Sequence, residues 1–456
     1  MINGRNIIKL VTLFLTFNFI VSCSSGGSAS GDSKILVITD IHFDPYNSCG
    51  TSPTPEAQAC VANLIRESNP ASWHFNSGDA NSFGEETNYA FLSEGLNNLK
   101  KLAITGQVDK IFVTGDLLSH NFPAQFESYV PNGSAAERTT LAINTMNYVM
   151  YQISQAVPER KMYYVFGNND TDNADYAYPS QDFMTRITST LAPYMANPES
   201  FSSTFAGGGY YIMPLNASTD VIGLNFNPLT VENSGNNQDL LIAESQLIWL
   251  KEQLATERKL NKHVIILQHE PFGMNLFNII ESKTPVYNLV TELQNEYLEL
   301  YKQYNNLINN YYYGHYHMED IQIGSNIFAF STLGFSVDYY NNPGFKILSL
   351  NSLGQLQNYT TFYSQYESNN LLEWSELYQL NSTYNITPAN YVSYFQTVIQ
   401  PESSNVGWNR YVSNYSGNNY LVTANRIPIV APSSWQVYYC GINYLAINAF
   451  NSCLQQ

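Results

Sequence analysis

The chain has 456 residues, which is enough for one large domain or two smaller ones with an ample hydrophobic core. Only 12% of its residues are charged, and its formal net charge is −17 at pH 7. An acidic chain of this kind is not expected to bind a nucleic-acid polymer or an anionic membrane through basic patches. The same charge disfavours a polyanionic substrate, except where bound cations reverse the local field.

The first 22 residues are expected to be a signal peptide of the lipoprotein type. Arg5 and Lys9 precede an apolar run over 10–21, which is shorter than the ~20 residues that span a bilayer as a helix. Small residues then precede Cys23, and a Ser/Gly-rich tether follows over 23–33. We therefore expect export and a membrane contact through a lipid on Cys23, in the cell envelope. The alternative is an ordinary signal peptide, cut nearby, and a secreted protein.

Four further cysteines occur in the expected mature chain. They are Cys49, Cys60, Cys440 and Cys453. An even number of cysteines in an oxidising compartment suggests disulfides, although four cysteines allow three pairings. Proximity along the chain favours Cys49–Cys60 and Cys440–Cys453.

Strand-like runs alternate with helical stretches between residues 34 and 350. Strands are expected at 34–39, 111–113, 161–166, 220–225, 263–268, 311–313, 327–330 and 345–350, and helices at 135–155, 239–257 and 287–308. This alternation predicts a layered α/β domain over 34–363, with central β-sheets flanked by helices. Long loops are expected at 76–84 and 167–182, near the edge where the strands end.

The composition changes near residue 364. From there to the end the chain has no Lys and no Asp, and Arg410 and Arg426 are its only strong cations. Amphipathic helices are expected at 371–380 and 389–400. These features predict a C-terminal, mostly helical subdomain over 364–456 that the last two cysteines lock.

Five of the strand-like runs are followed by side chains that bind metal ions. These are Asp40 and His42, Asp116, Asn168, His269, and His315 with His317. Parallel strands deliver the residues after their carboxyl ends to the same edge of a sheet, so these side chains should meet there. The set offers nitrogen and oxygen donors without a thiolate. It predicts a site for two divalent metal ions, with Asp116 as the natural bridging carboxylate.

A second Gly-Asp pair, Gly78-Asp79, is a possible rival to Gly115-Asp116. The run before it, residues 73–77, does not have the pattern of a buried strand. We therefore expect a loop near the cleft there, and no metal ligand.

The order of the motifs resembles that of the calcineurin-like metallophosphoesterases. The series is Asp-x-His, Gly-Asp, Gly-Asn-x-Asp, His-x-Pro and Gly-His-x-His. The stretch 40–46, and Thr114-Gly115-Asp116 with His120 after it, are similar to the acid sphingomyelinase-like branch of that family. This branch also includes nucleotide phosphodiesterases and endopolyphosphatases. Trp374 in the tail and the terminal cysteine pair resemble its C-terminal helical subdomain.

The resemblance implies two metal ions with a shared ligand. One ion would be held by Asp40, His42, Asp116 and His317, and the other by Asp116, Asn168, His269 and His315. Two such ions, ~3.5–4 Å apart, can clamp phosphate oxygens and activate a water for in-line attack. Donors of this kind permit Zn, Fe or Mn, and the branch resemblance points to Zn.

The chain departs from the family at Asn169. Most members have a His after the metal-binding Asn, and that His faces the phosphate and the leaving group. An amide can donate a hydrogen bond but cannot serve as an acid. His120 is then the candidate for protonating the leaving group. The alternative for His120 is a surface residue at the start of a helix.

These features predict an exported dimetal phosphodiesterase of the acid sphingomyelinase-like type, acting on a phosphodiester or phosphoanhydride substrate. An endopolyphosphatase or a nucleotide phosphoanhydride hydrolase is the alternative enzyme. The series Asn168-Asn169-Asp170 favours it and the acidic charge disfavours it. A catalytically idle binding protein on the same fold is an alternative of another class, and the complete set of seven donors argues against it.

Overall fold

A computed structural model describes residues 32–75, 78, 80–233, 235–276, 286–324, 327–366, 372–398, 406–418 and 435–455. The predicted signal peptide, Cys23 and most of the tether lie outside these residues, as does Asp79. The segment Asp32–Gln456 is one compact unit. No helix in its described part has both the length and the apolar character needed to cross a bilayer.

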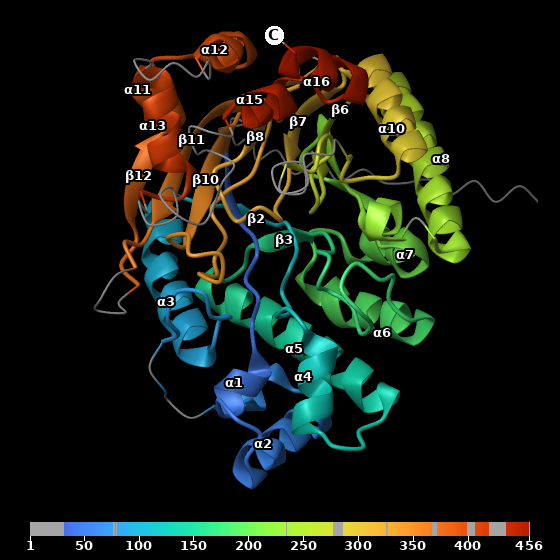
Figure 1. Cartoon of the computed structure of the whole chain (residues 1–456), viewed down its shortest axis with the longest axis vertical. Coiled ribbons are helices and arrows are strands. Elements are labelled where there is room, and N and C mark those ends of the chain that lie inside the picture. The colour runs from blue at the N-terminus through green and yellow to red at the C-terminus, as the bar shows by residue number, and fades with distance from the viewer. Residues whose placement is uncertain are drawn as a thin grey trace, which may run out of the picture. The chain divides into compact units, whose positions relative to one another are not determined.

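Two six-stranded sheets form the centre of this unit (Figure 1). The first has the order β12-β11-β10-β1-β2-β3, with β1 at Ser33–Ile38, β2 at Lys110–Val113, β3 at Lys161–Tyr164, β10 at Gly344–Leu350, β11 at Leu356–Tyr363 and β12 at Ser375–Gln379. The second has the order β4-β5-β6-β7-β9-β8, with β4 at Tyr211–Pro214, β5 at Thr219–Gly223, β6 at His263–Leu267, β7 at Ile308–Tyr312, β8 at Ile321–Gln322 and β9 at Ala329–Phe330. β1, β2 and β3 are parallel neighbours, and so are β5, β6 and β7.

Helices connect the strands and cover the sheets. They are α1 Pro45–Cys49, α2 Pro55–Arg66, α3 Tyr89–Thr105, α4 Phe122–Tyr129, α5 Ala135–Ala156, α6 Gln181–Leu191, α7 Pro198–Gly208, α8 Asn237–Leu260, α10 Thr291–Tyr304, α11 Leu380–Tyr384, α12 Tyr391–Val398, α13 Val406–Tyr415, α15 Trp435–Asn443 and α16 Ile447–Leu454. The helix α5, of 22 residues, starts with a capping box in which Ser134 and Glu137 satisfy each other's backbone N–H groups.

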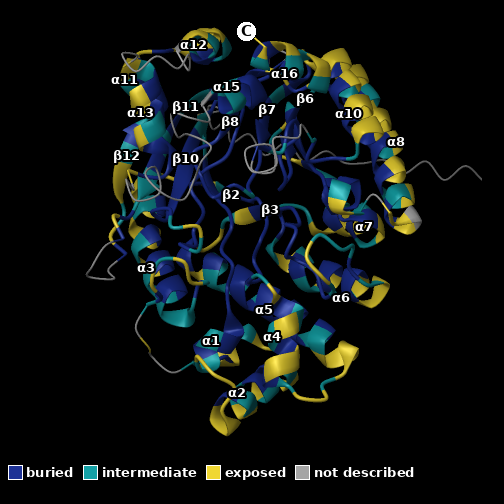
Figure 2. Ribbon diagram, viewed as in Figure 1, coloured by how far each residue is buried: buried dark blue, intermediate teal, exposed yellow. Residues whose placement is uncertain are grey.

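The alternation of side chains along each strand explains the layers. In β6, Ile265 and Leu267 join the core that includes the first sheet, while Val264 and Ile266 join the core under α8 and α10. The strands are buried, whereas α8 and α10 lie side by side with exposed residues on their outer faces (Figure 2). The predicted layered α/β fold with central sheets and flanking helices is therefore confirmed.

The eight predicted strands all form, with shifts of a few residues at their ends. Two of the predicted helices, over 135–155 and 239–257, correspond to α5 and α8. The predicted helix over 287–308 is wrong at both ends. Tyr287 forms an isolated β-bridge with Met274 before α10 begins, and Ile308 is already the first residue of β7.

The predicted helix over 371–380 is also wrong. The described residues there include β12, which pairs antiparallel with the edge of β11. The N–H and C=O groups along the edge of β11 form hydrogen bonds with the backbone of Ser375–Gln379. A single isolated helical turn would leave those edge groups unpaired. The predicted helix over 389–400 is confirmed in its described part by α12. β12 belongs to the first sheet although it lies beyond residue 364. The predicted boundary between a catalytic domain and a C-terminal subdomain at residue 364 stays a prediction.

Both predicted disulfides are confirmed. Cys49–Cys60 joins α1 to α2, and Cys440–Cys453 joins α15 to α16. Each closes a short loop, of 11 and 13 residues in sequence separation, in a segment made of short helices.

Candidate active site

All seven predicted ligand side chains come together where five strands end. They follow β1 (Asp40 and His42), β2 (Asp116), β3 (Asn168), β6 (His269) and β7 (His315 and His317). These strands are parallel within each sheet, so the loops after them meet at one edge. Hydrogen bonds join the loops directly. The backbone N–H of His315, for example, donates to Asp40 Oδ1 at 3.1 Å.

The first group of donor atoms lies around His42. Its Nε2 is 3.2 Å from Nε2 of His317 and 3.3 Å from Oδ2 of Asp116. Nε2 of His317 is 3.4 Å from Oδ1 of Asp40. Asp40, His42 and His317 are buried. Their donor atoms therefore surround one small volume that is closed to bulk solvent.

The second group lies around Asn168. Its Oδ1 is 3.0 Å from Nε2 of His269 and 3.0 Å from Nδ1 of His315. Nε2 of His269 is also 3.2 Å from Oδ2 of Asp116. The same carboxylate oxygen of Asp116 is thus shared by both groups.

Five of the seven side chains sit on a left-handed backbone that non-glycine residues rarely adopt. The φ angles are 51° at Asp40, 47° at His42, 54° at Asp116, 72° at His315 and 57° at His317. Such conformations cost roughly 1–3 kcal/mol each and persist where the surrounding structure enforces them. The chain therefore holds these donors at an energetic cost, which is typical of a functional site.

Two glycines allow the loops to approach closely. Gly115 has a φ of 97°, and a Cβ there would lie 2.6 Å from the backbone nitrogen of Gly167. A Cβ on Gly167 would lie 2.1 Å from Oδ1 of Asp116. A side chain at Gly115 would therefore collide with Gly167 and His269, and one at Gly167 would displace Asp116.

The two groups fit divalent cations. Oδ2 of Asp40 is buried and has no hydrogen-bond partner among the described residues, and burial raises the pKa of this carboxyl above its usual value. Burial also lowers the pKa of His42, and it lowers the pKa of His315 to about 3. Both rings are therefore neutral, which is the form that binds metals. Burial alone would lower the pKa of His269 and of His317, but the charges of Asp116 and Asp338 outweigh it and raise the pKa of these two rings. A bound cation would replace their protons and supply the positive charge that the buried carboxylates need.

Further residues orient these donors. Nδ1 of His269 donates to the carbonyl oxygen of Thr114 at 2.6 Å, which leaves Nε2 free to bind a cation. Nδ2 of Asn168 donates to Asp175 at 2.7 Å, which turns its oxygen toward the histidines. Asp170 accepts hydrogen bonds from the backbone N–H groups of residues 117, 118 and 167. Of these carboxylates only Asp170 has a sequence signal, the Gly-Asn-x-Asp motif.

Asn169 contacts the shared carboxylate. Its backbone N–H donates to Oδ1 of Asp116 at 2.8 Å, and its side-chain Nδ2 donates to Oδ2 at 3.0 Å. The residue that replaces the usual His thus fixes the orientation of Asp116.

His120 stacks on the first group. Its ring lies parallel to that of His42, with centroids 4.2 Å apart and planes 7° apart. Its Nδ1 is 2.8 Å from Oε1 of Glu86 and 3.3 Å from Oδ2 of Asp338. Burial alone would lower the pKa of His120, but the hydrogen bond and charge of Glu86 outweigh it and raise this pKa to about 10. His120 is therefore an imidazolium at neutral pH, beside the predicted metal site.

Neither Glu86 nor Asp338 was predicted from the sequence. Glu86 lies in the irregular segment before α3, and Asp338 lies between β9 and β10. Asp338 also contacts a predicted ligand, since its Oδ1 is 3.0 Å from Nδ1 of His317. Their positions follow no periodic pattern and no motif, so only the structure reveals them.

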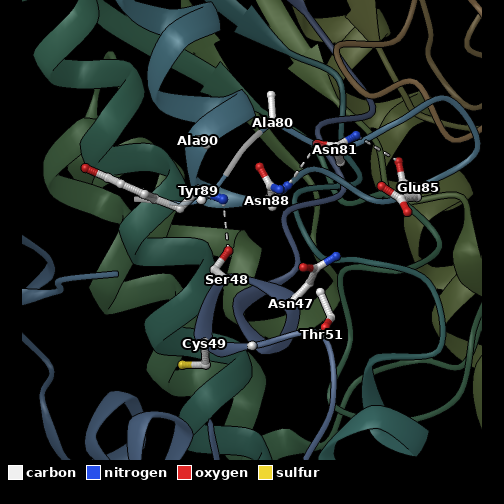
Figure 3. Close-up of a pocket in the computed structure, with 12 residues that line it drawn as sticks. Asn47, Ser48, Cys49, Thr51, Ala80, Asn81, Glu85, Asn88, Tyr89 and Ala90 are labelled. Atoms are coloured by element: carbon white, nitrogen blue, oxygen red, sulfur yellow. Dashed lines mark hydrogen bonds between the residues drawn. The ribbon is translucent and has the colours of Figure 1, made fainter. Parts of the chain in front are cut away.

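A separate cavity of about 380 Å³ is lined by residues 47–51, 78, 80, 81, 85 and 88–90. Figure 3 shows part of its wall, where the backbone N–H of Tyr89 donates to Ser48 and Asn81 bonds to both Glu85 and Asn88. None of the seven predicted ligands lines it. The described part of the predicted loop over 76–84 borders this cavity, and Asp79 lies outside the described residues.

The C-terminal helices support the loop that follows His317. The hydroxyl of Tyr438, in α15, donates to Oδ1 of Asp320 at 2.8 Å. The hydroxyl of Tyr411, in α13, donates to the carbonyl oxygen of Glu319 at 3.0 Å. The N–H of Glu319 in turn donates to the carbonyl of Tyr415 at 2.9 Å. The end of the chain thus anchors the loop that carries two of the predicted ligands.

Several curated relatives are named as sphingomyelin phosphodiesterases. Sphingomyelin phosphodiesterase B of Dictyostelium discoideum is 23% identical over 453 residues, covering 92% of this chain and 65% of that protein. Sphingomyelinase phosphodiesterase C of the same organism is 23% identical over 424 residues, covering 85% and 86%. Sphingomyelin phosphodiesterase of Bos taurus is 23% identical over 298 residues, covering 64% and 43%. The chain spans less than two thirds of the length of the first and third of these relatives.

A crystal structure of a dimetal phosphatase from Danio rerio aligns with a TM-score of 0.44 and 11% identity, covering 73% of this chain and 95% of that chain. Residues 33–319, which contain the five strand ends and all seven donor side chains, match the calcineurin-like phosphoesterase family. The chain therefore belongs to the calcineurin-like phosphoesterase family.

Proposed function

We propose that this chain is an exported phosphodiesterase of the acid sphingomyelinase-like type that works with two divalent cations. The observation that carries the proposal is the position of Asp116 Oδ2, 3.3 Å from His42 Nε2 and 3.2 Å from His269 Nε2. A carboxylate oxygen between two groups of donors is suited to bridge two cations. Similarity to three sphingomyelin phosphodiesterases supports a phosphodiester as the substrate.

Each cation has its own set of proposed ligands. The first set is Asp40, His42, Asp116 and His317, and the second is Asp116, Asn168, His269 and His315. Imidazole, amide and carboxylate donors without thiolate suit Zn, Fe or Mn, and Zn is the metal that we propose. When bound, such cations act as Lewis acids on phosphate oxygens and provide a nucleophilic water.

The protein's own groups orient the reaction and move a proton. Asn169 holds Asp116 through two hydrogen bonds, of 2.8 and 3.0 Å. His120 is the proposed proton donor to the leaving-group oxygen, since it carries a proton and stacks on a proposed ligand, His42. Asn169 has no acidic proton to offer, so its proposed role is to position the bridging carboxylate.

The alternative enzyme is an endopolyphosphatase or a nucleotide phosphoanhydride hydrolase. The series Asn168-Asn169-Asp170 favours it, and the formal net charge of −17 opposes the approach of a polyanion. A catalytically idle binding protein would bind the ligand without turnover. These three possibilities differ in which of the substrates, if any, the protein cleaves.

A substrate panel with metal analysis tests the proposal. The purified protein would be assayed with sphingomyelin in mixed micelles, bis(p-nitrophenyl) phosphate, nucleoside triphosphates and long-chain polyphosphate. We expect two metal ions per chain and turnover of the phosphodiesters, with Asp116→Asn as the inactive control. Cleavage of polyphosphate or triphosphates alone would replace the proposal by the alternative enzyme. Two bound metals without any turnover would favour the idle binding protein.

Export and anchoring are part of the proposal and rest on the sequence of residues 1–33. Mass spectrometry of the mature N-terminus is the direct measurement. A diacylated Cys23 is expected for an anchored protein of the cell envelope. A mature chain that starts elsewhere, without lipid, would indicate secretion instead.

A further inference from the structure

Two carboxylates from distant parts of the chain converge on one ring nitrogen of His120. Oε1 of Glu86 lies 2.8 Å from Nδ1, and Oδ2 of Asp338 lies 3.3 Å from it. We propose that Glu86 and Asp338 are positioning residues that fix the ring of His120 for proton transfer. This inference rests on the proposed role of His120 as the proton donor.

The contacts of Glu86 hold His120 at two points. Its Oε1 accepts from the ring Nδ1 and, at 3.3 Å, from the backbone N–H of the same residue. Both the main chain and the side chain of His120 are therefore tied to one oxygen atom. A ring held in this way loses the freedom to rotate out of its stack on His42.

Asp338 is itself held in place from two sides. Its Oδ1 accepts from the hydroxyl of Ser336 and, at 3.1 Å, from the N–H of Tyr339. The ring of Tyr339 packs against His317, with centroids 4.5 Å apart. Asp338 is almost fully buried, with 8% of its side chain exposed. The position of Asp338 is thus fixed, and its carboxylate can orient the ring of His120.

The same carboxylates reach the proposed metal ligands. Asp338 Oδ1 lies 3.0 Å from Nδ1 of His317, and Glu86 Oε2 lies 3.9 Å from Nδ1 of His42. A histidine that binds a metal through Nε2 carries its proton on Nδ1, and a carboxylate there orients the ring. The two carboxylates therefore orient both His120 and two proposed ligands of the first group, His42 and His317.

The cluster of His42, Glu86, His120 and Asp338 also has the composition of a cation site. The distances favour the positioning role. Ligand atoms on a tetrahedral cation lie about 3.3 Å apart when the bonds are about 2.0–2.1 Å. Nδ1 of His120 and Oε1 of Glu86 are only 2.8 Å apart, which is the length of a direct hydrogen bond.

The geometry leaves Nε2 of His120 for the reaction. Nδ1 donates to Oε1 of Glu86, with Oδ2 of Asp338 3.3 Å away, and among the described residues no hydrogen bond is formed by Nε2. In the proposed step the phosphorus–oxygen bond to the leaving group breaks, and the leaving oxygen takes the Nε2 proton. The attacking water gives its oxygen to phosphorus and releases a proton, and His120 regains one from solvent.

A double-mutant cycle tests the inference. Glu86→Gln keeps the size of the side chain and removes its charge. It should slow cleavage of an alkyl phosphodiester by roughly 10–100-fold, and slow an aryl phosphodiester with a good leaving group much less. In a His120→Ala background the same substitution should cause no further loss. Asp338→Asn should behave in the same way, with metal content measured because this residue also contacts His317.

Glu85→Gln is the matched control, because it alters the neighbouring carboxylate in the same segment, which faces the separate cavity. It should leave both rates unchanged. Equal losses from Glu86→Gln with and without His120 would overturn the inference, as would a loss of bound metal with equal effects on both substrates. Wild-type turnover of the aryl diester is measured first and tests the proposed function on its own. An active wild type with an additive cycle refutes the inference alone, whereas an inactive wild type refutes both.

Discussion

The rings of His42 and His120 are stacked in parallel, with centroids 4.2 Å apart. His42 belongs to the first group of donors, and Glu86 and Asp338 lie against Nδ1 of His120, at 2.8 and 3.3 Å. A displacement of either ring would disturb the other. The position of the proposed acid therefore depends on the proposed cation site, and the reverse is also true. A substitution in either one should be tested for its effect on both metal binding and proton transfer.

Asp116→Asn should remove activity by several orders of magnitude. The substitution removes the negative charge from the position that both donor groups share, so two cations lose their common anion. Kinetics on an aryl phosphodiester and elemental analysis of bound metal provide the measurement. Near-normal turnover with two metals per chain would contradict the assignment of Asp116.

His120→Ala and Asn169→Ala should differ in their dependence on the leaving group. General acid catalysis is worth roughly 10²–10⁴-fold, and most for a poor leaving group such as an alkoxide. His120→Ala should therefore slow alkyl phosphodiesters far more than activated aryl esters. Asn169→Ala should slow both to a similar extent, because it loosens Asp116 without removing a proton donor.

Rates for the two variants on a series of phenols and alcohols as leaving groups would provide this comparison. Asn169→Asp is a useful partner variant, since it keeps the size of the side chain and places a second anion beside Asp116. If His120→Ala reduces every rate by the same factor, His120 positions the phosphate and does not donate the proton.

Removal of metal should lower thermal stability. The carboxylates of Asp40 and Asp116 are buried, and Oδ2 of Asp40 has no hydrogen-bond partner among the described residues, so a cation that binds there only in the folded state stabilises that state. At 100 times its Kd, one such cation adds about 2.7 kcal/mol. Dialysis against a chelator should lower the Tm by roughly 5 °C or more, and Zn or Mn should restore it. Asp116→Asn should show a much smaller shift, and an equal shift would mean that the metals bind elsewhere.

Loss of the Cys440–Cys453 disulfide should destabilise the protein and weaken metal binding. A bridge that closes a loop of this length contributes about 3 kcal/mol. It joins α16 to α15, which carries Tyr438, and Tyr438 supports the loop after His317. The double serine variant would be compared with Tyr438→Phe, which keeps the disulfide and removes the hydroxyl that donates to Asp320. Urea unfolding and metal titration separate the two effects. Unchanged metal affinity in both variants would show that the C-terminal helices do not support the site.

The positions of the donor residues were predictable because parallel strands obey a simple rule. An apolar run that ends in Gly-Asp or Gly-Asn places its last residues at a common edge, and Asp116 and Asn168 follow that rule. Glu86 and Asp338 were not predictable, since they lie in irregular segments and meet only when the chain has folded. The segment 375–379 was wrongly predicted as part of a helix for the same reason. It forms a strand because it pairs with the edge of β11, which lies outside its own sequence.

The position of β1 also has a consequence for the time course of folding. This first strand pairs with β2 on one side and with β10 on the other, and Ser33 lies opposite Leu350. Contacts between residues so far apart in sequence give a high contact order and slow folding. The first sheet cannot close, and Asp320 cannot reach Tyr438, before nearly the whole polypeptide has been synthesised. Hydrolytic activity should therefore arise only in a completed chain, so a nascent or truncated product would carry the early donors without a working centre.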